Sequence, residues 1–549
     1  MKNIKKIMVA AVLGLGLTTI TSCKKILKEE LVSEIVPANF YKTEADARAA
    51  VNSVYNELYT YDLYVQPMWN LTMLDDDHVS GADWFLGSAG AGNPQNYFGI
   101  DNPWIGYYKV IARANIVIEN VGPMTGINEI IKNRILGEAY FLRGWSYFQL
   151  VQLYGKVPLR LKSLTADKNA DIPRASIKEV YDVIISDLKM ASTNLVAPND
   201  ANVGEVGRVN KAVSESFLAK VYLTIGSASA PATTVRVRSG NINETVDYPH
   251  TKEVVAGYNV FNSQEYFALA RAKALEVIDT YKSLYPLYTS WTDLWKKDNR
   301  NKGEHMWMLQ SLEGTAFTNQ MHTYFSARSL FGTGAVYMTN SHYNDYEDQD
   351  LRILNGVVHN YTANNTAQTK YYYPRRDATK YQVVNGVTYT NNGTTNEKAY
   401  IIKYSDVTSP LLGVSDAHFP FLRFSELYLI YAEADNEING PTGSPAPLTA
   451  LAAINTIRGR AMATNVPSTI TKEGLRDFVL AERAREFALE TGIRHFDLLR
   501  WGLYLSVMNK VTAPQDNINK KRVLRNLLLP IPLSEMSTNK LIGGNNPGW

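Results

Sequence analysis

The chain has 549 residues, 45% of them hydrophobic, so it can bury a large core and could form two or three domains. Its 56 lysines and arginines nearly balance its 53 aspartates and glutamates, which argues against a nucleic-acid partner, because such a partner needs a concentrated basic surface. Its single cysteine excludes a disulfide within the chain.

The first 22 residues have the layout of a secretion signal. Three lysines within the first six residues precede an apolar run over 7–20, which is shorter than the ~20 residues that span a bilayer. The tripeptide Thr21-Ser22-Cys23 ends this run and resembles the lipobox of bacterial lipoproteins. We therefore expect residues 1–22 to be a lipoprotein signal peptide and Cys23 to become the lipidated N-terminus. Residues 23–40 would form a tether, and acyl chains would hold the protein on a membrane outside the cytoplasm.

Residues 41–230 read as an N-terminal helical region. The stretch over 130–154 is apolar almost all round, which predicts a helix buried between neighbours. Gly155 and Pro158 follow it and predict its end. The pattern predicts helices over 44–60, 104–120, 130–154, 176–195 and 211–226.

Residues 231–420 are richer in Gly, Asn, Thr and Tyr and predict a loop-rich variable region with short strands. One helix is expected over 262–281. Asn385-Gly386 lies between β-branched runs, which is a strong signal for a β-hairpin. Long loops of this kind are often functional.

Residues 421–549 return to a helical pattern, with helices expected over 421–438, 446–463, 473–490 and about 495–508. Small and aromatic residues recur on one face of these helix pairs, which suggests tetratricopeptide-like units. The sequence thus predicts a mainly α protein. Its tetratricopeptide-like helical repeats would pack against a loop-rich half with small β-hairpins, and the whole mature chain would form one compact domain.

A series of motifs runs in order along nearly the whole mature chain. The first half contains RILGEAYFLRGWSYFQLVQLYGKVPL, SIKEVYDVIISDLKMASTNL and GRVNKAVSESFLAKVYL. The second half contains FLRFSELYLIYAEADNEI, AINTIRGRA, ERAREFALETGIRHFDLLRWG, LLLPIPLSEM and a final NNPGW. Behind the lipobox-like start, this ordered set resembles the SusD/RagB family of outer-membrane nutrient-binding lipoproteins.

The resemblance implies a binding protein of the outer membrane that faces the cell exterior and is not an enzyme. Its ligand would be an oligosaccharide, or a peptide as in RagB-like uptake proteins. Its partner would be a SusC-like TonB-dependent transporter, which the lipoprotein covers as a hinged lid. In the motif NPWIGYYKVI, Gly106 and Lys109 stand where the starch-binding relative uses a stacking tryptophan and an asparagine. This departure puts starch in doubt as the ligand.

The densest charge cluster lies in ERAREFALETGIRHFDLLRWG. Glu482 and Glu486 share one helix face with Leu475, Val479, Leu489 and Ile493, so two carboxylates lie on an apolar stripe. A buried carboxylate needs a partner. We expect a structural ion-pair network here, although a glycosidase-like acid/base pair is the alternative. The expected members are Glu482, Arg483, Glu486, Arg494, Asp497 and Arg500.

Aromatic residues in loops are the candidates for ligand contact, because 11% of the chain is aromatic and such rings present a flat apolar face with a polar edge. Asp76 is the expected acid beside them. The candidate rings are Trp84, Phe85, Tyr97, Phe317, Tyr324 and Phe325.

No cofactor or metal is expected. Asp75-Asp76-Asp77-His78 has no EF-hand spacing and is expected to be a solvated loop or to supply one ligand-binding acid. Two other functions compete with nutrient binding. A glycan-degrading enzyme would need a cleft with two carboxylates ~5–10 Å apart. A tetratricopeptide-type scaffold would bind only proteins.

Overall fold

The computed structural model describes residues 40–242, 244–326, 333–362, 366–372, 382–391, 398–409 and 415–549. The expected signal peptide, the lipidation of Cys23 and residues 23–39 of the tether lie outside the described residues. Within the described ranges, no helix is both long and apolar enough to cross a membrane.

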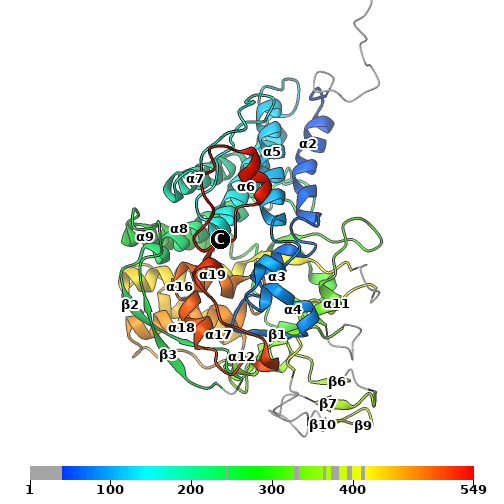
Figure 1. Cartoon of the computed structure of the whole chain (residues 1–549), viewed down its shortest axis with the longest axis vertical. Coiled ribbons are helices and arrows are strands. Elements are labelled where there is room, and N and C mark those ends of the chain that lie inside the picture. The colour runs from blue at the N-terminus through cyan, green and yellow to red at the C-terminus, as the bar shows by residue number, and fades with distance from the viewer. Residues whose placement is uncertain are drawn as a thin grey trace, which may run out of the picture.

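Antiparallel helices build the N-terminal half of the molecule (Figure 1). They are α2 (Glu44–Asn56), α5 (Asn102–Val121), α6 (Glu129–Tyr154), α7 (Ile177–Asn194), α8 (Lys211–Ser229) and α9 (Ser263–Tyr281). Successive helices from α5 to α9 pack against one another. Capping boxes at Thr43 and Ser176 fix the starts of α2 and α7 by satisfying backbone N–H groups that lack a partner in the first turn.

Helix α6 lies at the centre of this half, as its nearly uniform apolar surface predicts. Eighteen of its 26 residues are buried. At Gly144 the helix approaches α7 so closely that an added Cβ would lie 2.9 Å from the Cβ of Asp187. On another side of the helix, Trp145 packs edge-on against Trp307 of β4 (His305–Leu309), with ring centroids 5.3 Å apart. Helix α6 therefore joins the helical layer to the strands behind it.

The C-terminal region supplies a second group of helices. They are α16 (Phe424–Asn439), α17 (Ala450–Arg460), α18 (Lys472–Glu486), α19 (Ile493–Arg500), α20 (Tyr504–Lys510) and α21 (Leu533–Thr538). Helix α16 packs against α9, α17 and α18, so the helical array continues from the first half into the second. The fold is mainly α, with helical repeats packed against a loop-rich part, as the sequence predicts.

Several predicted helices have different boundaries. The helix expected over 421–438 begins at Phe424, because residues 421–423 belong to a strand, and the helix expected over 446–463 is shorter at both ends. The expected helix over 473–490 ends at Glu486, because Leu489, Thr491 and Gly492 all have positive φ and turn the chain before α19. Leu489 and Ile493 therefore do not share a helix face with Glu482. The expected helix over 495–508 is two helices, α19 and α20, separated at Gly502, whose φ is also positive.

The strands are short and pair across long sequence distances. β1 (Val79–Gly81) pairs with β5 (Val336–Met338), and β4 (His305–Leu309) pairs with β11 (Phe419–Arg423), both antiparallel. β2 (Thr233–Arg238) and β3 (Asp247–Lys252) form a hairpin beside α18. Smaller pieces are β6 (Asn360–Thr362), β7 (Lys370–Tyr372), β8 (Val383–Val384), β9 (Val387–Thr388) and β10 (Thr390–Asn391). β8 and β9 form the hairpin predicted at Asn385-Gly386, where both residues have positive φ.

Short helices join these elements. They are α3 (Pro67–Thr72), α4 (Asp83–Gly90), α10 (Trp291–Leu294), α11 (Met321–Phe325), α12 (Asn340–Tyr343) and α13 (Leu351–Leu354). Single 3₁₀ turns lie at Glu57–Tyr59, Pro94–Asn96, Lys297–Asn299, Gln515–Asn517 and Leu524–Leu527. One large hydrophobic cluster draws residues from the N-terminal, middle and C-terminal regions alike.

Candidate functional site

Few large aromatic side chains are exposed. Among the described residues, Tyr61, Trp84, Phe98 and Phe317 are the aromatic side chains with large exposed fractions, at 46%, 67%, 70% and 40%. Exposed rings that gather in one place are typical of a binding surface, whereas single exposed apolar side chains need no explanation. Their positions relative to one another therefore decide whether they form a site.

The first group of rings, which includes Trp84 and Tyr324, lies where three short helices meet. Helices α3, α4 and α11 lie side by side (Figure 1). The ring of Tyr324 in α11 stacks on Phe85 of α4, with centroids 4.0 Å apart and planes 19° apart. Trp84 lies at the edge of both rings, 5.7 Å from Phe85 and 6.3 Å from Tyr324. Trp69 of α3 packs behind them and is buried, so the outer rings rest on a firm apolar base.

A second pair of rings adjoins the first. Tyr61 stacks on Phe98, with centroids 6.2 Å apart and planes 26° apart. The buried ring of Tyr97 supports Phe98 from 4.8 Å. Tyr97 also packs in one cluster with Leu71 of α3 and Ala89 of α4, so the second pair adjoins the helices that carry the first group of rings. We call Tyr61, Trp84, Phe98 and Tyr324 the aromatic platform.

Two glutamines supply hydrogen-bonding groups at the platform. The hydroxyl of Tyr324 donates to Gln320 Oε1 at 2.9 Å, and the hydroxyl of Tyr61 donates to Gln66 Oε1. Each bond uses a carboxamide oxygen, so the amide N–H groups stay available as donors. Flat rings beside amide donors suit a ligand that has both apolar faces and hydroxyl groups.

The platform includes two of the residues singled out from the sequence, Trp84 and Tyr324. Phe85 lies directly beneath them and is 7% exposed, so it supports the surface rather than forming it. Phe317 is exposed, but its ring packs edge-on against Tyr59, with centroids 5.0 Å apart. Tyr61 and Phe98 were not among the residues predicted from the sequence. Phe98 directly follows Tyr97, and only the structure decides which of two adjacent rings faces outward.

Besides Phe85, three predicted ligand contacts need correction. Phe325 is 1% exposed and packs against Trp69 and Tyr404, so it belongs to the core. Tyr97 is 6% exposed beneath Phe98. Both rings were expected in flexible loops, but α11 and the 3₁₀ turn at Pro94–Asn96 order these segments and turn the two rings inward.

Asp76 is the third correction, because its side chain is buried and cannot serve as an exposed ligand-binding acid. Its carboxylate accepts from the backbone N–H of His78 at 2.8 Å. Burial raises the pKa of Asp76 to about 7, and the carboxylate of Asp77 adds to this. Residues 75–78 are not the expected solvated loop. Asp75 pairs with Arg522 at 2.6 Å and Asp77 pairs with Arg494 at 2.8 Å, so the segment ties the N-terminal half to the C-terminal region.

Glu482 and Glu486 lie in a buried ion-pair cluster, although most of their partners were not foreseen. Burial alone would raise the pKa of both carboxyls, but the surrounding guanidinium groups outweigh it and lower both, that of Glu482 to about 2. Neither group therefore holds a proton at neutral pH, as a general acid must. Glu482 pairs with Arg352, Arg458 and Arg485 at 2.6, 2.7 and 3.1 Å, and Glu486 pairs with Arg352, Arg423 and Arg460.

The other expected members of this network form separate groups. Arg483 and Arg500 share the carboxylate of Asp497, at 2.7 and 2.8 Å. Arg494 pairs with Asp77 instead. The expected single network is therefore at least three groups, because α18 ends at Glu486 and its last turn and α19 face different neighbours. Among the described residues, no three His, Cys, Asp or Glu side chains are grouped closely enough to hold a metal ion.

Two family models match opposite parts of the chain. The model described as "SusD family" matches residues 288–549, and the model described as "Starch-binding associating with outer membrane" matches residues 19–223. The SusD-like protein P25 of Formosa agariphila is 25% identical over 564 residues, which cover 95% of each chain. A SusD-like protein of Bacteroides ovatus is 25% identical, covering 86% of this chain and 78% of its own.

Solved structures share the fold. A SusD homolog from Bacteroides thetaiotaomicron superposes with a TM-score of 0.73 at 20% identity, covering 94% of this chain and 99% of its own. Surface glycan-binding protein A from Bacteroides fluxus superposes with a TM-score of 0.65 at 19% identity, covering 92% and 100%. The solved structures thus share the fold of this chain. From the matches of the two family models along both halves of the sequence and from the SusD-like relatives, the chain belongs to the SusD family.

Proposed function

We propose that this protein is a cell-surface lipoprotein that binds an oligosaccharide on its aromatic platform. The observation that carries the proposal is the gathering of Tyr61, Trp84, Phe98 and Tyr324 around helices α3 and α4. The names of relatives support it, since solved neighbours include a surface glycan-binding protein and a putative sugar binding protein.

The chemistry of the platform suits sugar rings. The C–H face of a sugar packs on an aromatic ring, while its hydroxyls exchange hydrogen bonds with amides and phenols. Gln66 and Gln320 provide such amides at the two tyrosines. Binding of this kind is reversible and breaks no bond. The low pKa values of Glu482 and Glu486 also favour binding over hydrolysis, because the one close carboxylate pair singled out from the sequence has no general acid.

We infer that the ligand is not held as starch is held by the starch-binding relative. A side chain at Gly106 has no room, because its Cβ would lie 2.6 Å from Leu63 Cγ in the packing of α5. Lys109 is occupied by Asp62, with Nζ 2.6 Å from the carboxylate. The two positions that supply a ring and an amide in that relative therefore supply neither here.

The proposed function also specifies where the protein is located and which protein receives its ligand. Cys23 would carry the lipid anchor, the protein would face the cell exterior at the outer membrane, and a SusC-like TonB-dependent transporter would receive the oligosaccharide. The family description of association with the outer membrane supports this arrangement. Co-purification with a SusC-like transporter from detergent-solubilised outer membranes tests the partnership, with a Cys23→Ala variant as the control that lacks the anchor.

A ligand screen tests the binding function. The purified mature protein is run through gels that contain one soluble plant, algal, host-type or bacterial polysaccharide each, and through a panel of peptides. We expect slowed migration with at least one polysaccharide, and chromatography of that polysaccharide after overnight incubation should show unchanged chain length. Shortened chains would instead identify an enzyme, binding of peptides alone would identify a RagB-like protein, and binding of neither would favour a protein-only scaffold.

A further inference from the structure

A large hollow in the molecule is built from elements that do not form the aromatic platform. It is a cavity of about 350 Å³ between the end of α6, the ends of α7 and α8, the segment 251–258, helices α19 and α20, and residues 527–528. Ligand sites in proteins typically have volumes of about 300–1,000 Å³. We call this hollow the chamber.

The chamber has an apolar wall and an open rim. Its wall includes Val151, Ile177, Val255, Phe496, Leu499 and Leu505. Its rim includes Thr251 and Ala256, which are exposed to solvent, so a ligand can enter from outside. An apolar cavity of about 150 Å³ already holds benzene in an engineered protein, and the chamber is more than twice that size.

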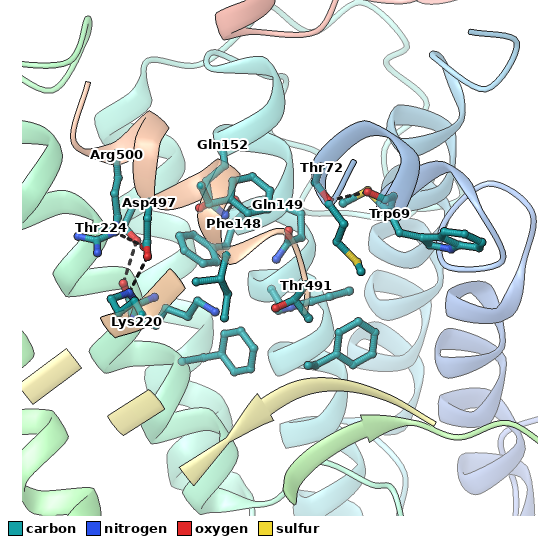
Figure 2. A pocket seen from close by; sticks show the side chains of 18 of the residues that line it. Trp69, Thr72, Phe148, Gln149, Gln152, Lys220, Thr224, Thr491, Asp497 and Arg500 are labelled. Atoms are coloured by element: carbon teal, nitrogen blue, oxygen red, sulfur yellow. Dashed lines mark hydrogen bonds and ion pairs between the residues drawn. The ribbon is translucent and has the colours of Figure 1, made fainter. Parts of the chain in front are cut away.

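The inner end of the chamber is polar. Gln152, Thr224 and Arg500 line it, and they also line a second cavity of about 40 Å³ that lies deeper in the molecule (Figure 2). The amide of Gln152 donates to Phe148 O, and the hydroxyl of Thr224 donates to Lys220 O, so both oxygens can still accept.

Two buried polar atoms line the deeper cavity without a hydrogen-bond partner. They are Nη1 of Arg483 and Oγ1 of Thr491, and the Arg483 side chain is 2% exposed. A buried guanidinium N–H without an acceptor is costly, so the deeper cavity, which shares Gln152, Thr224 and Arg500 with the chamber, favours a group that can accept a hydrogen bond.

The charges at this end decide what kind of head group fits. Lys220 pairs with Glu426 at 3.0 Å, Arg483 pairs with Asp497 at 2.7 Å, and the guanidinium of Arg500 pairs with Glu433 and Asp497. Around the deeper cavity, the three cations Lys220, Arg483 and Arg500 are thus each already paired with a carboxylate. An uncharged hydroxyl or carbonyl group matches this balance, whereas a carboxylate would add an uncompensated buried charge.

We propose that the chamber is a second binding site, for an uncharged amphiphilic molecule with an apolar chain and one hydrogen-bonding head group. The chain lies against Val255, Phe496 and Leu499, and the head lies against Gln152, Thr224 and Arg500. The site is independent of glycan binding, because it shares no residue with the aromatic platform.

Decan-1-ol and decanoate test the proposal, since they share an apolar chain and differ in the charge of the head. We expect saturable one-to-one binding of decan-1-ol with a Kd below about 100 µM, as apolar ligands of this size can reach. Decanoate should bind at least about tenfold more weakly, because the cations at the polar end, Lys220, Arg483 and Arg500, are each already paired with a carboxylate. Isothermal titration at 25 °C measures both.

Two matched variants locate the binding. Ala256→Trp fills the rim of the chamber from an exposed position and should weaken decan-1-ol binding at least about tenfold by occupying its volume. Ala166→Trp makes the same change at an exposed loop position outside the chamber and should leave binding unchanged, as should Trp84→Ala on the platform. Melting temperatures show that each variant is folded.

Four results would overturn the proposal. They are no saturable binding of decan-1-ol, equal binding of decanoate, full binding by Ala256→Trp, and a chamber filled by a second copy of the chain, which dilution of the protein would reveal. Loss of glycan binding with decan-1-ol binding intact would count against the proposed function alone.

Discussion

The substitution Glu482→Gln tests the assignment of the C-terminal charge cluster to structure rather than catalysis. In the folded protein the pKa of the Glu482 carboxyl lies at about 2, below its ordinary value of 4.5, because the attraction of Arg352, Arg485 and Arg458 exceeds the opposing effect of burial. At about 1.4 kcal/mol for each pH unit, this difference corresponds to about 3 kcal/mol of folding free energy at neutral pH.

Glutamine keeps the shape of the side chain and removes its charge. We therefore expect Glu482→Gln to lower the free energy of unfolding at pH 7 by about 3 kcal/mol, which is a large part of the ~5–15 kcal/mol that holds a typical protein folded. For a chain of this length the melting temperature should fall by about 3 °C. Urea titration and calorimetry at pH 7 measure both quantities.

The direction of the pKa shift predicts how the stability difference between wild type and variant changes with pH. A carboxyl whose pKa is lowered by folding stabilises the folded state above pH 4.5, and this contribution disappears as the pH falls toward 2. The difference between wild type and Glu482→Gln should therefore shrink to about 1.4 kcal/mol at pH 3. Glu276→Gln, which changes an exposed carboxylate paired with Lys273, should cost at most about 0.5 kcal/mol at any pH.

If Glu482→Gln were as stable as the wild type but no longer bound the ligand, the structural role of Glu482 would be refuted. It would also be refuted if the difference in stability between the two proteins grew as the pH was lowered.

Three further substitutions test the fold. Phe325→Ala should lower the free energy of unfolding by about 3–5 kcal/mol, measured in urea, because it empties a buried position in the core; an unchanged midpoint would contradict its place there. Gly81→Ala should cost about 1–3 kcal/mol by the same assay, because its Cβ would lie 2.0 Å from the carbonyl oxygen of Ala335 across the β1–β5 pair, and equal stability would mean that these strands are not paired in this register. Ser176→Ala should cost about 1 kcal/mol and increase amide exchange in the first turn of α7, where an unchanged exchange rate would argue against the cap.

The spacing of apolar residues and the turn residues predict most of the helices and one hairpin, because these elements depend on residues that are close together in the sequence. The apolar stretch over 130–154 is α6 almost residue for residue, and Asn385-Gly386 forms the expected hairpin. Boundaries fail where the backbone leaves the helical region without a Pro or Gly directly ahead. Leu489 is the example. The helical spacing of apolar residues continues past Glu486 to Leu489 in the sequence, but the positive φ of Leu489 is incompatible with a helix there.

Long-range pairing could not be predicted from one sequence. The pairing of β4 with β11 joins residues more than 100 positions apart, and neither strand alone shows a clear alternation, since all ten of their residues are buried. The partners of Glu482 were missed for the same reason. Arg352 lies 130 residues away from it in the sequence and Arg458 lies 24 residues away.

In the candidate site, too, the sequence alone could not predict which side chains face outward. Aromatic composition identified the segments around Trp84 and Tyr324, but only packing shows that Trp84 faces outward while its neighbour Phe85 faces inward. Asp76 was predicted to contact ligand because a run of three aspartates is expected to be exposed to water. In the structure, the whole segment is buried, because Arg494 and Arg522, which are distant in the sequence, pair with its neighbours.

The central claim is that the aromatic platform binds a glycan, and isothermal titration of Trp84→Ala with the polysaccharide found by the screen tests it most directly. Trp84 is 67% exposed, so removing its ring should leave the melting temperature unchanged. We expect the affinity to fall at least about tenfold, as loss of a central aromatic contact does. The control Leu533→Ala, which removes a 77% exposed apolar side chain from α21, should bind like the wild type. Unchanged affinity in Trp84→Ala, with binding otherwise intact, would contradict the claim.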